Sequence, residues 1–126
     1  MQSLQSDLEK LSLEQLEELY ASLSDYDENP VHIDEFLDSD KYIGPFLEGG
    51  LYPYWRDFLR DIYPSPYCSP YWLINLRGAI GIGKSLVACV GISYELHKLL
   101  SMRNPQTEFG LLPSTRILFA IFNITL

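Results

Sequence analysis

Residues 78–85 constrain the fold and the chemistry of this chain more than any other segment does. They read Gly-Ala-Ile-Gly-Ile-Gly-Lys-Ser, which matches the pattern G-x-x-x-x-G-K-[ST] at every fixed position and adds a third glycine. Glycines let a strand turn sharply into a helix while the backbone approaches an anion, which loop amides and the helix dipole then stabilise. The pattern predicts a phosphate-binding loop; the alternative is a glycine-rich turn that only caps a core helix.

Each part of this loop has an expected task. The Lys84 ammonium supplies positive charge to the β- and γ-phosphates, and the Ser85 hydroxyl is the expected ligand of Mg²⁺. The expected ligand is therefore a nucleoside triphosphate, ATP, together with Mg²⁺. Arg77 directly precedes the loop and is a candidate for either a phosphate contact or a structural ion pair. The predicted nucleotide-binding residues are Gly78, Ala79, Ile80, Gly81, Ile82, Gly83, Lys84 and Ser85, with Lys84 as the predicted catalytic residue.

The segments around the loop predict the fold class. Residues Tyr71–Leu76 form a short, nearly continuous apolar run, which is typical of a strand buried on both faces. Residues Ser85–Leu100 are apolar nearly all round and predict a buried helix. After a loop at Arg103–Pro113, residues Ile117–Ile124 again predict a strand. We expect an α/β fold, a P-loop NTPase with a parallel sheet that is incomplete within these residues, preceded by a helical N-terminal region.

Three helices are expected before the loop. The first runs from Leu13 to Leu23, where Ser12 and Gln15 have the spacing of a capping box. It is interpreted as a small helix that docks on the body or is offered to a partner protein. The second begins at Pro30 and ends at Gly44-Pro45 or at Gly49-Gly50. The third runs from Tyr54 to Tyr63 and is stopped by Pro64.

Charge and composition divide the chain and exclude some functions. Residues 1–40 hold 12 acidic residues and a single base, Lys10, whereas the rest has a small excess of bases. This distribution excludes a simple basic protein that coats nucleic acid. Cys68 and Cys89 lack the spacing of a zinc site, and no apolar run approaches the roughly 20 residues that cross a membrane. The expected divisions are an acidic helical segment at 1–29, a helical lead-in at 30–70 and the start of an ATPase domain at 71–126.

The order of three segments resembles a known family. Residues 30–44 (Pro-Val-His-Ile-Asp-Glu-Phe-Leu, then Tyr-Ile-Gly), residues 51–59 (Leu-Tyr-Pro-Tyr-Trp-Arg-Asp-Phe-Leu) and the loop at 78–85 are similar to the start of the large terminase subunit of tailed bacteriophages. The stretches 94–113 and 117–123 are similar too, so the resemblance covers about residues 30–126. Members of this family are ATP-driven DNA-packaging motors with a C-terminal nuclease domain.

The resemblance implies further site residues. Segment 51–59 is similar to the family's adenine-pocket motif, in which an aromatic side chain and a glutamine face the base. Tyr54 stands at the aromatic position and Trp55 at the glutamine position, so stacking is retained while amide readout of adenine is not. The alternative is that Tyr54 and Trp55 are core contacts of their helix. Many terminases also carry an arginine where this chain has Ala79, and Arg77 is the nearest substitute.

The resemblance also implies partners and a cellular setting. In the full-length protein these are double-stranded viral DNA, the small terminase subunit and the portal, in a homo-oligomeric ring in the host cytoplasm and without membrane attachment. No apolar run ending in Asp-Glu follows Ser85, so the chain is expected to be a fragment that neither hydrolyses ATP nor cuts DNA. Two alternatives are another P-loop ATPase, helicase-like or kinase-like, and a non-enzymatic nucleotide-binding interaction module.

Overall fold

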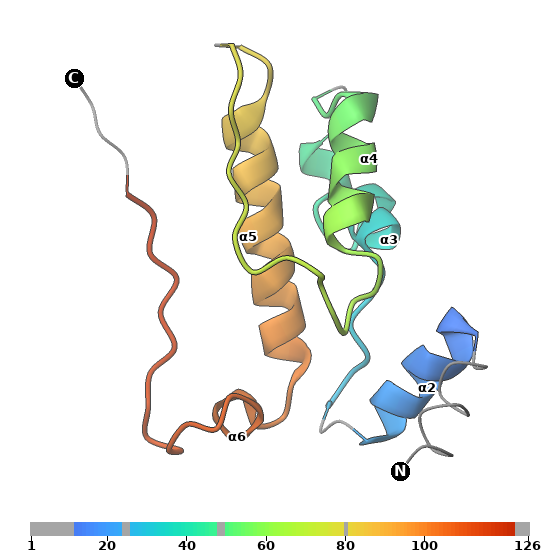
Figure 1. Cartoon of the computed structure of the whole chain (residues 1–126), viewed down its shortest axis with the longest axis vertical. Coiled ribbons are helices and arrows are strands. Elements are labelled where there is room, and N and C mark those ends of the chain that lie inside the picture. Colours follow the sequence, from blue (N-terminus) through green and yellow to red (C-terminus); the bar gives the residue numbers. More distant parts are fainter. Residues whose placement is uncertain (1–11, 24–25, 48–49, 80, 123–126) are drawn as a thin grey trace.

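Helices are the only regular secondary structure in the part of the chain that the structure describes. The structure is a computed structural model and describes residues 12–23, 26–47, 50–79 and 81–122. Figure 1 shows α4 and α5 side by side, with α3 against α4. The elements are α2 (Leu13–Leu23), α3 (Ile33–Asp38), the 3₁₀ turn η1 (Gly44–Phe46), α4 (Pro53–Ile62), α5 (Lys84–Ser101) and α6 (Pro105–Glu108).

The predicted parallel sheet is wrong. The extended segments 73–79 and 115–122 form no strand, and Figure 1 shows the first passing in front of α5 and the second running beside it. Within the described ranges, no backbone hydrogen bond joins residues 72–77 or 116–122 to another part of the backbone. The predicted burial of Tyr71–Leu76 is also wrong, because Trp72 is 93% exposed. An apolar run can favour an extended backbone locally, but a strand exists only when a second strand pairs with it.

The hydrophobic core lies between α3, α4 and α5. Three side chains in it are fully buried: Leu37 of α3, Leu59 of α4 and Tyr94 of α5. Because no sheet covers its outer side, α5 is not buried all round as predicted, and Leu100 is 74% exposed. The remaining buried apolar residues of the core are Ile33, Phe36, Trp55, Ile62, Tyr63, Val87 and Val90.

The predicted boundaries of α2 and α4 are close to those found. Helix α2 spans the predicted residues, and the capping box is confirmed by hydrogen bonds from Ser12 N–H to Gln15 Oε1 (3.0 Å) and from Gln15 N–H to Ser12 Oγ (3.3 Å). Helix α4 starts at Pro53, one residue before the prediction, because the fixed φ of proline suits the first turn. It ends at Ile62, one residue earlier than predicted. The segment predicted to be a loop at 103–113 contains the short helix α6.

The predicted start and end of the second helix are wrong. Helix α3 begins three residues after Pro30, and the Ser39 N–H donates to the carbonyl oxygen of Glu35 at its end. The chain then turns back, and the Gly44 N–H donates to the Ser39 carbonyl oxygen over 3.2 Å. A Cβ at position 44 would lie 2.7 Å from the Asp38 carbonyl oxygen, so this close return requires glycine.

Helix α5 holds the chain segment that leads into α3. The Tyr94 hydroxyl donates to the Val31 carbonyl oxygen (2.8 Å), and the Val31 N–H donates to His97 Nε2 (3.1 Å). His97 can accept this bond only through an unprotonated Nε2, so the neutral ring is the form that supports the contact. Burial lowers the pKa of His97 below its usual value, and the positive charge of Lys41 acts in the same direction.

We expect the stability of the fold to decrease as the pH falls from 7.5 to 5.5. The pKa of His97 is lower in the folded state, so the unfolded state binds more protons in this range and acid favours unfolding. The loss is at most about 1.4 kcal/mol per pH unit. Urea unfolding at the two pH values measures it, with His97→Gln as the control that removes this titration. An equal pH dependence in the wild type and in His97→Gln would contradict the assignment.

None of the helices in the described part of the chain is both long enough and apolar enough to cross a membrane.

Candidate phosphate-binding loop

The glycine-rich segment forms a tight turn at the start of the longest helix. Helix α5 begins at Lys84, directly after the loop, and Gly83 is its N-terminal cap with a φ of 88°. Its carbonyl oxygen accepts the Val87 N–H over 3.0 Å, which closes the first turn. The first backbone N–H groups of any α-helix have no acceptor within the helix, and in α5 these are the N–H groups of Lys84, Ser85 and Leu86. They are the donors that a phosphate-binding loop needs.

Lys84 folds back over the loop that precedes it. Its Nζ donates to the carbonyl oxygen of Gly78 and to that of Ala79, the latter over 3.0 Å. The ammonium group therefore lies over the turn, where the predicted phosphate contact requires positive charge. The Ser85 side chain is exposed at the first turn of α5, so its hydroxyl is accessible to Mg²⁺. Across the described ranges, no three His, Cys, Asp or Glu side chains gather as in a metal site.

Trp55 connects α4 to this loop across 27 positions of sequence. Its side chain is 5% exposed, and its indole N–H donates to the Ile82 carbonyl oxygen. A Cβ at position 83 would lie 3.3 Å from Trp55 Nε1, and the φ of Gly83 is one that other residues rarely adopt. Trp55 is thus a core residue of α4, as one of the two interpretations expected, and it also holds the turn of the loop.

Two tyrosines stand beside the loop with exposed rings. Tyr54 is 70% exposed and is therefore not a core contact. Its ring packs edge-on against the Trp55 ring, with 5.1 Å between the two ring centroids. Tyr52 is 58% exposed, and its ring lies beside Gly83: a Cβ added at Gly83 would be 3.9 Å from Tyr52 Cδ2. Sequence reasoning missed Tyr52, although it belongs to the same segment, 51–59, that carries Tyr54. A hollow of about 320 Å³ is lined by Tyr52, Tyr54, Trp55, Gly81 and Ile82.

The structure says less about the predicted roles of the residues at the start of the loop and just before it. Arg77 is exposed and has no ion-pair partner among the described residues, so the structural ion pair considered for it is not found. Ala79 contributes its carbonyl oxygen to the contact with Lys84. Ile80 lies outside the described residues, so its predicted part in the loop stays a prediction.

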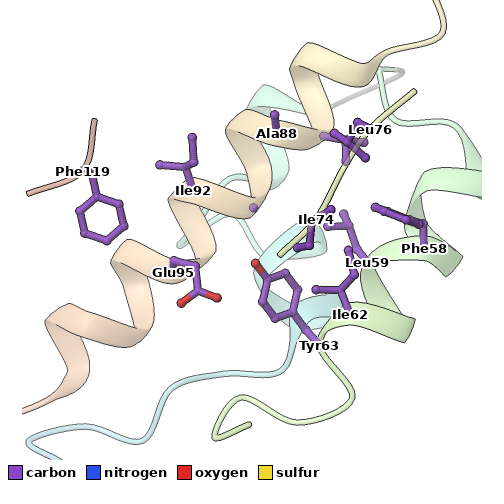
Figure 2. Close-up of a pocket in the computed structure, with 12 residues that line it drawn as sticks. Phe58, Leu59, Ile62, Tyr63, Ile74, Leu76, Ala88, Ile92, Glu95 and Phe119 are labelled. Carbon is purple, nitrogen blue, oxygen red and sulfur yellow. The ribbon is translucent and has the colours of Figure 1, made fainter. Parts of the chain in front are cut away.

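Another cavity, of about 250 Å³, lies between α4, α5 and the two extended segments (Figure 2). Apolar side chains such as Ile74, Ile92 and Phe119 form most of its wall, and Glu95 and Tyr63 are the polar side chains there. The Glu95 carboxylate pairs with Lys98 Nζ over 2.9 Å. Burial and the nearby Glu95 raise the pKa of Tyr63 above its usual value. No cationic side chain of a described residue lines this cavity, so it lacks a charged group for phosphate and the loop remains the candidate site.

Comparisons with protein-family models, with curated proteins and with solved structures find no match to this chain. The geometry of the loop and the side chains around it therefore carry the functional argument.

Proposed function

We propose that residues 78–85 bind the polyphosphate of a nucleoside triphosphate, ATP, together with Mg²⁺. The observation that carries this proposal is the position of Lys84, whose Nζ lies against the carbonyl oxygens of Gly78 and Ala79 at the N-terminus of an 18-residue helix. Loop amides and first-turn amides supply neutral donors, and Lys84 supplies the charge. The proposal does not require the sheet, because every phosphate contact in it comes from the loop and α5.

The wider role rests on the resemblance of residues 30–126 to the large terminase subunit. On that basis, the chain is proposed to be the ATP-binding portion of a motor that packages viral DNA into a procapsid. Double-stranded DNA, the small terminase subunit and the portal are then the partners of the full-length protein. Mg²⁺, when bound, would neutralise phosphate charge, and Ser85 is the side chain of this loop that would ligate it.

Phosphate dependence tests the proposal. Calorimetric titration of the chain with ATP and with AMP, both with Mg²⁺, should show clear binding of ATP and much weaker binding of AMP. The physical reason is that the loop donors and Lys84 act on the β- and γ-phosphates, which AMP lacks. Equal affinities for ATP and AMP would contradict a polyphosphate site at this loop.

A further inference from the structure

The indole N–H of Trp55 already has a hydrogen-bond acceptor in the phosphate loop. An indole has a single N–H donor and no acceptor, and in Trp55 this donor already bonds the Ile82 carbonyl oxygen. The side chain is also 5% exposed and packs beside Gly83. Trp55 therefore has no free hydrogen-bonding group with which to recognise the edge of a base, although it borders the hollow beside the loop.

The hollow next to the loop offers aromatic surface and few polar groups. Among the described side chains that line it, the only polar atoms besides the Trp55 nitrogen are the hydroxyls of Tyr52 and Tyr54. No described residue contributes a side-chain carboxylate, amide or guanidinium group to this hollow. A site discriminates strongly between polar isosteres only when fixed donors and acceptors are left unpaired by the wrong ligand. Stacking, in contrast, tolerates every base because each base has a π face.

We propose that this site binds nucleoside triphosphates without selecting the base, with Tyr52 and Tyr54 as a stacking surface and Trp55 as a positioning residue for the loop. The inference rests on the proposed function and names its ligand class more broadly, as ATP and GTP alike. In this arrangement the phosphates determine where the ligand binds, and the tyrosines add affinity that does not depend on the groups at the base edge.

Calorimetric titrations with ATP, GTP and inorganic tripolyphosphate, all with Mg²⁺, test the proposal. We expect the dissociation constants of ATP and GTP to agree within about 3-fold, which is less than 1 kcal/mol. Both nucleotides should bind at least about 5-fold more tightly than tripolyphosphate, because stacking of one base contributes about 1–3 kcal/mol. Tripolyphosphate measures the loop alone, so it separates this inference from the proposed function.

Variants of the tyrosines test the stacking surface. The double variant Tyr52→Leu/Tyr54→Leu keeps apolar bulk but removes both rings, and it should bring ATP and GTP to the affinity of tripolyphosphate. Binding of tripolyphosphate itself should be unchanged. Tyr71→Leu is the matched control, because Tyr71 is 56% exposed and does not line the hollow. Its affinities for all three ligands should equal those of the wild type.

Trp55→Phe tests the positioning role, because phenylalanine retains an aromatic ring but cannot donate to Ile82. All three ligands should bind more weakly by the same factor, so that the ratio of ATP to GTP affinity stays constant. This ratio does not depend on the fraction of folded protein, so a loss of stability alone does not move it. A ratio that changes in Trp55→Phe would show that Trp55 reads the base and would overturn its assigned role.

Two other outcomes would overturn the inference and leave phosphate binding at the loop intact. One is an affinity for ATP at least 10-fold higher than that for GTP, which requires readout of the base edge. The other is equal affinity for ATP, GTP and tripolyphosphate in the wild type, which means that no base is contacted. If the wild-type chain did not bind tripolyphosphate at all, in contrast, that result would contradict the proposed function.

Discussion

Replacing Lys84 by alanine is expected to weaken the binding of ATP with Mg²⁺ by about 10- to 150-fold. Hydrogen bonds to charged groups contribute about 1.5–3 kcal/mol, and each 1.4 kcal/mol is a factor of ten in the dissociation constant. Lys84 is the side chain that places positive charge against the loop, where its Nζ contacts the carbonyl oxygens of Gly78 and Ala79. Calorimetric titration of the variant and the wild type measures the change.

Removal of a charge elsewhere provides the control for Lys84→Ala. Arg116 is exposed and makes no ion pair within the described part of the chain, so Arg116→Ala removes the same net charge without touching the loop. Its affinity for ATP should stay within about 2-fold of the wild type, since exposed charges more than a Debye length apart are screened. An equal loss in both variants would mean that ATP responds to net charge and not to a site at Lys84.

The second large effect is expected from Leu59→Ala in α4. Leu59 is 1% exposed and borders the cavity of about 250 Å³ between α4 and α5, so truncation enlarges a space that the fold already leaves open. Leucine-to-alanine changes in cores cost about 2–5 kcal/mol, of a total that is about 5–15 kcal/mol for most domains. Urea unfolding followed by circular dichroism at the helix band should therefore show a large shift of the midpoint.

Leu100→Ala is the matched control, because it removes the same atoms from a side chain of α5 that is 74% exposed. Its free energy of unfolding should lie within about 0.5 kcal/mol of the wild type. Similar midpoints for Leu59→Ala and Leu100→Ala would contradict the placement of the core between α3, α4 and α5.

Local contacts explain which elements could be predicted from sequence. The start of α2 depends on Ser12 and Gln15, which are three residues apart, and α4 was predicted from apolar residues at helical spacing and from Pro64 just after its end. The glycines at 81 and 83 were predicted to turn sharply, and both have a positive φ. Each of these features depends on neighbours within about one helical turn.

Contacts between distant residues explain what could not be predicted. The apolar run at 71–76 predicted a buried strand, but pairing depends on a second segment, and no such pairing occurs among the described residues. The predicted burial of α5 on all sides depended on the same sheet. The hydrogen bond from Trp55 to Ile82 joins residues 27 positions apart, and no sequence pattern predicts it. Part of the candidate site, the anchoring of the loop by α4, therefore required the structure.

The most direct test of the central claim is a map of where tripolyphosphate touches the chain. Amide nitrogen-15 and proton shifts of the labelled chain, recorded during titration with tripolyphosphate and Mg²⁺, provide this map. The account predicts that the changes concentrate at Gly81, Gly83, Lys84 and Ser85, and at the indole N–H of Trp55. Changes that concentrate at other basic residues, with the loop signals unmoved, would contradict it.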